Sequence, residues 1–553
     1  SSKEDEDIVD KKSSATSSKE DAVDKKSPAT SSKGDEDIVD KESSATSSEE
    51  DEDIVDKKAS ATSSKEDEDI VDKESSATSS EEGAKDVRVK ETVKIENTDS
   101  EEDTQNYQLF LEKEVEKQAG LRLGPDFETF LRAPHCCDSK QRSLRANHDH
   151  VILCKYRDPS KPFPREYSDC WDDKNVRMPC SPRNKHEVKD VGLVSRWDVI
   201  RDAFSLPIAT SYDLQKAILS YNARKWTFRL LHIFLIENLT PEEQKNFFKS
   251  TLPGIIRMAL SLPEVVTKPP PLLKGRKDMT ITMSQHQAAV LLSCAFLCMF
   301  PRRNSPNGAN DEYYHYPSIN FSGLFRLENN RPVSRKIEKL RCILHYFKRV
   351  VEKTPRGKIS FKRQVMEHKC KEPQWHASCK RLCRLRISSD GTIEDSAPGM
   401  LQVDFANERI GGGVLGSGCV QEEIRFVICP ELIVARLFTE KLQENECLII
   451  NGAERFSDYD GYGDSFKWAG NHEDQTPRDN WGRLHTEIVA IDALKQTGNI
   501  NQYAAHYIKR ELNKAYIGFH SKDIDDPQNL PAVATGNWGC GAFGGDRQLK
   551  SLL

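Results

Sequence analysis

A run of glycines limits what this chain of 553 residues can fold into. Three consecutive glycines are followed, after seven further residues, by a glutamine and two glutamates: Gly411, Gly412, Gly413, Gln421, Glu422 and Glu423. A backbone without side chains can approach a ligand closely and can direct several N–H groups at one anion. Residues 401–407 are typical of a strand that ends in polar side chains, and residues 424–428 are typical of an apolar helix. This order predicts a strand, a phosphate-binding loop and a helix that begins with two carboxylates.

The first 106 residues are predicted to be disordered. An acidic segment of up to 16 residues occurs in five similar copies, at 1–16, 17–30, 31–46, 47–62 and 63–78. Each copy offers one Ile-Val pair, or a single Val, as its apolar element, which cannot offset the entropy lost on ordering. The period matches none of the common solenoid repeats. We expect a tail without a fold, acting either as a passive spacer or as a segment that repels or mimics polyanions.

Charge is divided unevenly along the chain. Residues 1–82 contain 12 Lys, no Arg and 27 Asp plus Glu, a net charge of −15, whereas the whole chain carries −7. The remainder therefore carries +8, which suits a protein that handles a polyanion and is also typical of an ordinary solvated basic surface. The longest apolar run, residues 288–300, is too short to cross a bilayer. With no secretory signal and 15 cysteines without disulfide-like spacing, we expect a soluble nuclear or cytoplasmic protein.

The folded part is predicted to contain two domains. Residues 107–354 have mainly helical periodicity, apart from a stretch of loops at 133–195, and capping-box spacing occurs at Thr240 and Ser284. Residues 355–553 alternate between β-rich segments, at 358–361, 384–388, 401–405, 446–450, 515–519 and 532–535, and helical segments, at 430–442, 485–496 and 502–513. This alternation predicts an α/β domain with a mixed sheet between helices.

A second glycine-rich segment, residues 535–546, follows the last predicted strand. Its five glycines in ten positions indicate a loop whose N–H groups surround a diphosphate, although alone they fit a generic turn equally well. The segment lacks the Gly-Lys-Ser/Thr of a Walker loop and the βαβ context of a dinucleotide-binding fingerprint. Both glycine-rich loops follow strands, and open α/β sheets bind ligands at the C-terminal ends of their strands.

These residues resemble a known family. The segment 403–407, the glycine triplet and the Gln-Glu-Glu sequence resemble the signature of poly(ADP-ribose) glycohydrolases. Further similar segments occur in the family's order, at 161–181, 281–287, 300–304, 391–394, 511–516 and 534–546. The resemblance implies a macrodomain, at residues 355–553, preceded by a helical accessory domain at 107–354. It also implies a glycosidase of the DNA damage response that hydrolyses ribose–ribose O-glycosidic bonds in poly(ADP-ribose) and releases ADP-ribose.

The acidic pair is the expected source of catalysis. Glu422 and Glu423 are adjacent, so their side chains point in different directions and cannot flank one glycosidic bond as the usual pair of carboxylates does. An ordinary acidic first turn of a helix is the alternative explanation. By resemblance, Glu423 protonates the leaving 2′-oxygen and then activates water, while Glu422 holds ribose hydroxyls. Asp404 and Asn407 would order the ribose and the loop.

Further substrate contacts are implied by the same resemblance. The triplet glycines and Gln421 belong to the signature, and the second loop would hold the diphosphate through Asn537, Gly539, Cys540, Gly541 and Ala542. Phe543 would pack against the ribose-phosphate portion. Adenine would be recognised by Ile393, Glu394 and a stacked Tyr462, although an aromatic in such a loop more often serves local packing.

No cofactor and no metal site are expected. His368, Cys370, His376, Cys379 and Cys383 are clustered, but they lack two clean metal-ligand pairs, and the resembled family needs no metal. The sequence at 135–137, His-Cys-Cys, is interpreted in the same way.

The chain stops at Leu553, part-way into a helix opened by Asp546, and the resembled family continues beyond this point. We expect the missing segment to weaken the domain. An alternative function is therefore a non-catalytic module that binds ADP-ribose polymers. The expected partners are poly(ADP-ribose) and poly(ADP-ribosyl)ated proteins, with no DNA requirement, no membrane and a monomeric state.

Overall fold

The computed structural model describes residues 146–553, with gaps at 156, 223–225, 304–310, 329–332, 367–372, 382, 389–390, 497–499 and 523–529. The predicted disordered tail and residues 107–145 lie outside the described residues. The described chain belongs to one compact unit, residues 98–553. None of its helices combines the length and apolar character of a membrane span.

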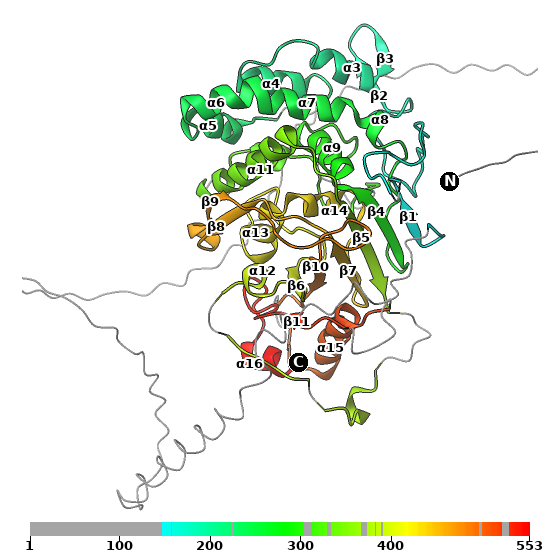
Figure 1. The fold of residues 1–553 in the computed structure, drawn as a ribbon, viewed down its shortest axis with the longest axis vertical. Helices are drawn as coiled ribbons and strands as arrows, with labels where there is room; N and C mark the ends of the chain where they lie inside the picture. Colours follow the sequence, from blue (N-terminus) through cyan, green and yellow to red (C-terminus); the bar gives the residue numbers. More distant parts are fainter. Residues whose placement is uncertain are drawn as a thin grey trace, which may run out of the picture. The chain divides into compact units, whose positions relative to one another are not determined.

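A seven-stranded mixed sheet forms the centre of this unit (Figure 1). In spatial order its strands are β1 (His150–Ile152), β4 (Met279–Ser284), β5 (Lys358–Val365), β7 (Glu446–Asn451), β10 (Glu487–Asp492), β6 (Leu401–Ala406) and β11 (Val533–Ala534). β1 is parallel to β4, and β10, β6 and β11 are parallel to one another. The strands from β4 to β10 alternate in direction. The predicted mixed sheet is confirmed, and it includes two strands, β1 and β4, from the segment predicted to be mainly helical.

The two faces of the sheet bury separate hydrophobic clusters. On β7, Leu448 belongs to the larger cluster and Ile449 to the smaller one, because successive side chains of a strand point to opposite faces. On β6, Val403 belongs to the smaller cluster and Ala406 to the larger one. Asp404 therefore lies on the face of the larger cluster.

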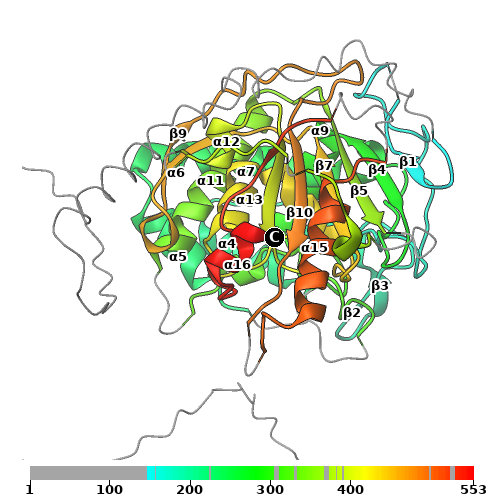
Figure 2. The same ribbon diagram turned by 90° about the horizontal axis from the view of Figure 1, so that it is seen from below.

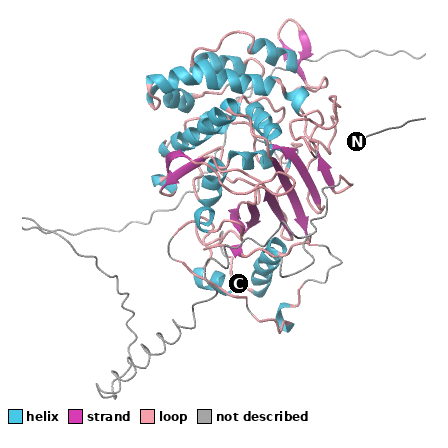
Figure 3. Cartoon of the chain, viewed as in Figure 1, coloured by secondary structure: helices cyan, strands magenta, loops and turns pink. Residues whose placement is uncertain are grey.

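Helices cover the face of the larger cluster (Figure 3). Next to the sheet lie α9 (Gln285–Phe296), α13 (Gln421–Ile428), η3 (Pro430–Val434) and α14 (Ala435–Phe438). Outside them lie α3 (Arg196–Ala203), α4 (Ser211–Leu219), α5 (Arg229–Glu237), α6 (Pro241–Asn246), η1 (Phe247–Thr251), α7 (Leu252–Leu260), α8 (Leu262–Val265), α10 (Ser322–Phe325) and α11 (Ser334–Glu352). α9 is buried on nearly all sides, which explains its continuous apolar sequence.

The opposite face is covered by α15 (Ala505–Phe519), which packs on β5, β7 and β10 (Figure 2). The chain ends nearby with α16 (Arg547–Leu552). The remaining elements are two hairpins, β2 (Lys185–Val188) with β3 (Gly192–Ser195) and β8 (Ser457–Asp460) with β9 (Lys467–Asn471), and the short helices η2 (Trp375–Ala377), α12 (Ile393–Ser396) and η4 (Gly463–Ser465).

Local capping signals predicted helix starts well. Thr240 and Ser284 form the predicted capping boxes, each side-chain oxygen accepting the N–H three residues later, from Glu243 and Gln287. In both cases the interaction spans only one helical turn, so the sequence contains all of it.

Three element predictions in residues 355–553 are wrong. Residues 485–496, predicted as a helix, contain β10, which is buried on both faces and so lacks polar alternation. Residues 515–519, predicted as a strand, complete α15, where Ile517 packs into the smaller cluster. Residues 384–388 have strand-like alternation, but Leu385 and Ile387 are both exposed and the segment is not a strand.

Candidate active site

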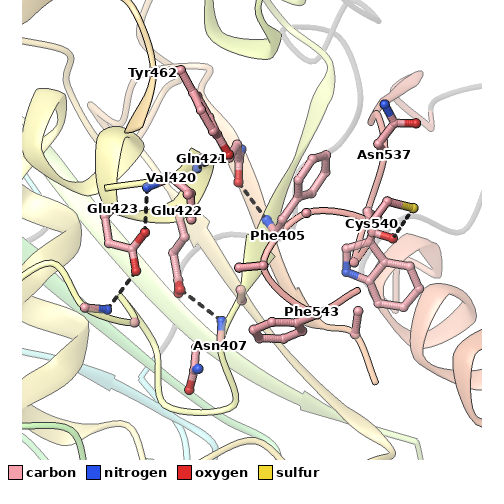
Figure 4. Close-up of a pocket in the computed structure, with 18 of the residues that line it drawn as sticks. Phe405, Asn407, Val420, Gln421, Glu422, Glu423, Tyr462, Asn537, Cys540 and Phe543 are labelled. Atoms are coloured by element: carbon pink, nitrogen blue, oxygen red, sulfur yellow. Dashed lines mark hydrogen bonds between the residues drawn. The ribbon is translucent and has the colours of Figure 1, made fainter. Parts of the chain in front are cut away.

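A pocket of about 300 Å³ opens where β6 ends (Figure 4). It is lined by the end of β6, the start of α13, Tyr462, the loop after β11 and Arg547. Of the predicted site residues it brings together Asn407, Gly412, Gly413, Gln421, Glu422, Glu423, Tyr462, Asn537, Gly539, Cys540, Gly541, Ala542 and Phe543. Gly411, Asp404, Ile393 and Glu394 do not line it.

Gln421 attaches the first turn of α13 to β6. Its Oε1 accepts a hydrogen bond from the N–H of Phe405 at 2.9 Å, and its Nε2 donates to the carbonyl of Val403 at 3.2 Å. Its own N–H donates to the hydroxyl of Tyr462 at 3.2 Å. The side-chain amide is thus engaged in holding the helix at the end of the strand.

Each glutamate of the acidic pair is held by two backbone N–H groups. Glu422 accepts from Asn407 at 2.9 Å and Gly411 at 2.6 Å. Glu423 accepts from Gly413 at 2.7 Å and Val420 at 2.9 Å. Both side chains are buried, at 3% and 6% exposure, and both line the pocket. The two carboxyl groups are therefore fixed in different directions, as their adjacency predicts.

The N–H groups of the glycine triplet donate hydrogen bonds to acceptors within the protein. Those of Gly411 and Gly413 donate to the two glutamates, and that of Gly412 donates to the carbonyl of Arg409 at 3.1 Å. The prediction that this loop directs its N–H groups at a phosphate is therefore wrong. The sequence could not reveal this, because it contains no information on which acceptor each N–H meets.

The glycines are needed because the carboxylates occupy the adjacent space. A Cβ atom on Gly412 would lie 2.5 Å from Oε1 of Glu423 and 2.7 Å from Oε2 of Glu422. A Cβ atom on Gly418 would lie 2.6 Å from Oε1 of Glu423. Gly412 also has φ of +42°, in the left-handed region that favours glycine. The loop thus forms a close-fitting wall around the acidic pair.

A third carboxyl group lies behind this pair. Asp404 is 1% exposed, and neither of its oxygens has a hydrogen-bond partner among the described residues. Burial, followed by the charge of Glu423, raises the pKa of Asp404 to about 8. Burial, followed by the charges of Asp404 and Glu423, also raises the pKa of Glu422 well above its usual value. Asp404 therefore favours its protonated form at neutral pH.

The loop after β11 presents unused N–H groups to the pocket. Within the described chain, the N–H groups of Gly539, Gly541, Ala542 and Phe543 donate to no protein acceptor. Trp538 anchors the loop, because its indole N–H donates to the carbonyl of Ile491 at 2.9 Å. Consecutive free N–H groups form a concavity that suits an anion.

The residues predicted to recognise adenine are not gathered in this pocket. Tyr462 lines it and is 55% exposed, but Glu394 lines a separate pocket of about 160 Å³. The carboxylate of Glu394 accepts a hydrogen bond from Tyr459 and lies 3.8 Å from Arg425. Ile393, in α12, lines neither pocket.

Several pocket residues were missed from the sequence. Arg547, the first residue of α16, contributes a positive charge, and Phe405 and Trp538 contribute aromatic surface. Trp538 lies inside the second glycine-rich loop, which could have identified it. A single arginine carries no pattern of its own, so nothing in the sequence singled out Arg547.

The described residues contain no group of three or more His, Cys, Asp and Glu side chains arranged to hold a metal ion. His368, Cys370 and residues 135–137, which the sequence analysis weighed as ligands, lie outside the described residues. The candidate site is therefore built from carboxylates, backbone N–H groups and one guanidinium.

Comparisons with known proteins agree with this architecture. Residues 372–553 match a family model described as poly(ADP-ribose) glycohydrolase, macrodomain fold, and residues 239–363 match its helical domain. The chain is 34% identical over 378 residues to a probable poly(ADP-ribose) glycohydrolase 2 of Arabidopsis thaliana, covering 58% of this chain and 71% of the relative. It is 33% identical over 401 residues to poly(ADP-ribose) glycohydrolase 1 of the same plant, covering 58% and 72%. It is also 38% identical over 284 residues to poly(ADP-ribose) glycohydrolase 1 of Caenorhabditis elegans, covering 49% and 34%.

Proposed function

The chain belongs to the poly(ADP-ribose) glycohydrolase family, and we propose that its pocket hydrolyses ribose–ribose O-glycosidic bonds in poly(ADP-ribose) to release ADP-ribose. One observation carries this proposal: two buried glutamates line the same pocket as a loop with four free N–H groups. Acid chemistry and diphosphate binding are the two requirements of this substrate.

The acid is proposed to be Glu423. Cleavage needs a proton for the leaving 2′-oxygen, stabilisation of an oxocarbenium-like centre and then a base for water. Glu423 would donate that proton and then, as a carboxylate, activate water, while Glu422 would hold ribose hydroxyls. Both glutamates are buried, line the pocket and accept two backbone N–H groups, so these features do not distinguish them. The choice of Glu423 therefore rests on the family resemblance. Asp404 would contribute from behind, as a protonated neighbour that limits the negative charge of the cluster.

The rest of the pocket is proposed to bind one ADP-ribose unit. The free N–H groups of Gly539 and of residues 541–543, together with the guanidinium of Arg547, would hold the diphosphate. Phe543 would pack against ribose-phosphate, and Tyr462 would stack on adenine. Gly412 and Gly413 would shape the wall beside the reacting ribose, and Asn407 would order it. Ile393 and Glu394 would contact the adenine from outside this pocket.

The direct test is release of ADP-ribose from purified poly(ADP-ribose) by the chain and by Glu423→Gln and Glu422→Gln. We expect Glu423→Gln to lower kcat by at least about 10²-fold, the usual scale for loss of a general acid. Glu431→Gln is the matched control, since Glu431 is fully buried and binds Gln285 at 2.9 Å, away from the pocket. Full turnover by Glu423→Gln would refute its assignment. Loss of turnover in Glu422→Gln but not in Glu423→Gln would assign the role of general acid to Glu422.

The alternative function, a module that binds polymer without cleaving it, is not favoured by the family matches. It predicts a different result in the same experiment: retention of polymer with no release of ADP-ribose by the unmodified chain. Measuring polymer retention on the immobilised protein alongside turnover separates the two functions.

Partners and location are proposed on the same basis. We propose that the chain acts as a monomer on poly(ADP-ribose) and on proteins that carry it, without requiring DNA, in the nucleus or cytoplasm. Among the described residues the 12 cysteines are all free thiols, as in a reducing compartment. Light scattering after gel filtration and cell fractionation would test these statements.

A further inference from the structure

A buried lysine from α11 holds the glycine loop. Lys339 is fully buried, and the three N–H groups of its ammonium are shared among four carbonyls of that loop that lie within hydrogen-bond distance of Nζ. The distances are 3.1 Å to Gly413, 3.0 Å to Val414, and 2.6 Å to both Gly416 and Gly418. These acceptors follow it in the sequence by 74 to 79 residues. One ammonium group therefore fixes the whole turn between residues 413 and 418.

The same turn fixes the proposed acid. The N–H of Gly413 donates to Oε1 of Glu423 at 2.7 Å, while its carbonyl accepts from Lys339. The backbone of Gly418 is also close to Glu423, since a Cβ atom there would lie 2.6 Å from the carboxylate. A displacement of the turn would therefore move Glu423 with it.

A second buried cation supports the preceding part of the loop. Arg436, in α14, donates from Nη1 to the carbonyls of Ile410 at 2.8 Å and Gly412 at 3.0 Å. Arg436 thus holds residues 410–412, and Lys339 holds residues 413–418. The latter turn has no comparable cation other than Lys339 in the described chain.

Burying the charged ammonium group of Lys339 costs free energy, even though it satisfies these carbonyls. No carboxylate makes an ion pair with Lys339 among the described residues. The acidic groups whose charges act to raise its pKa are Cys419, Glu423 and Glu328. Burial, the largest cause, lowers its pKa to about 8. A buried charge that makes no ion pair is a poor source of stability. Its four contacts point instead to a positional role.

We propose that Lys339 is a positioning residue for catalysis, which fixes the turn at residues 413–418 and through it the carboxyl group of Glu423. The inference rests on the proposed function, because it assigns Lys339 to the chemical step. It also places a determinant of kcat in α11, within the segment predicted from the sequence as the helical accessory domain.

The test compares Lys339→Met with Lys339→Gln and with a matched control, Lys514→Met. Lys514 is equally buried and donates to the carbonyls of Gln443 and Glu446 and to Asp492, away from the pocket. We expect Lys339→Met to lower kcat by about 10- to 100-fold, the effect of displacing a catalytic group by about 1 Å. KM and the Kd of free ADP-ribose should change by less than about threefold, because the loop that binds diphosphate is untouched. Lys339→Gln keeps two N–H donors and should fall between Lys339→Met and the unmodified chain.

Amide hydrogen exchange provides a readout that needs no turnover. Exchange of residues 411–420 should accelerate in Lys339→Met and remain unchanged in Lys514→Met. Unchanged kcat and exchange in Lys339→Met would overturn the proposal, as would an equal loss of kcat in Lys514→Met. Failure of both Lys339 variants to fold, beside a folded Lys514→Met, would also overturn it in favour of a structural role. If the unmodified chain released no ADP-ribose, the proposed function would fail, while the exchange result would still decide whether Lys339 holds the turn.

Discussion

The substitution Gly418→Ala tests whether the loop needs glycine there to leave space for the carboxylate of Glu423. The new Cβ atom would lie 2.6 Å from Oε1 of Glu423 and 2.9 Å from the Cα of Gly413. Contacts this short cannot persist, so either the carboxylate or the turn must move. Gly418 does not have a left-handed φ, and the substitution therefore adds contact without backbone strain.

The expected magnitudes separate contact from strain. Overpacking at Gly418 should lower the free energy of unfolding by about 1–3 kcal/mol, and displacement of Glu423 should lower kcat by about 10²-fold. Gly412→Ala adds left-handed strain at φ +42°, worth about 1–2 kcal/mol more. Gly192→Ala, in the β2–β3 hairpin, has φ +88° and no atom within 4 Å of the new Cβ. It should cost only the strain and leave kcat unchanged.

Thermal unfolding and initial rates of ADP-ribose release on the three variants provide the measurement. The ratio of kcat values reports the position of the acid, and the change in Tm reports strain and packing together. A Gly418→Ala protein with unchanged kcat would refute the close-fitting wall. So would a loss of kcat in Gly192→Ala as large as that in Gly418→Ala, because it would make the effect nonspecific.

Two further predictions concern charged groups behind the pocket and within it. The fold raises the pKa of Asp404 from 3.8 to about 8 and so favours its protonated form, a stabilisation complete below pH 3.8 and lost as pH rises through about 8. Asp404→Asn, which resembles the protonated form, should therefore melt at a higher temperature than the unmodified chain at pH 9 and similarly at pH 4; the reverse order at pH 9 would contradict it. Arg547→Gln should raise KM by about 10- to 100-fold with little change in kcat, if its guanidinium makes a charge-assisted hydrogen bond to the diphosphate. An unchanged KM in steady-state kinetics would remove Arg547 from the substrate site.

The sequence predicted the site best where its determinants are local. The strand before the glycines, the acidic first turn of α13 and the second glycine-rich loop are each contiguous, and they meet at the end of β6 in one pocket. The direction of the N–H groups was predicted wrongly, because a run of glycines shows that close approach is possible without showing to what. In the structure the close neighbours of Gly412 are Glu422 and Glu423, whereas Gly411 faces Arg436 and Phe426.

Long-range features could not be read in the same way. β10 is covered on both faces, so its apolar run resembles a helix core, and β4 joins the sheet only through pairing with β1 and β5. Lys339 and Arg547 are ordinary surface residue types whose roles depend on contacts with distant segments. Neither belongs to a motif, and only the folded chain brings them to the site.

The contacts of the glycine loop also show that the position of the acidic pair depends on the helices as well as on the sheet. The larger hydrophobic cluster runs from Leu153 through the helices to Ala490 on β10, so helices and sheet share one core. β4 and β5 pair over six registered positions, although one lies before residue 354 and the other after it. Lys339 donates to the carbonyl of Gly413, and the N–H of Gly413 donates to the carboxylate of Glu423. The position of the proposed acid is therefore set jointly by the helical segment and the sheet, and neither part contains the whole site.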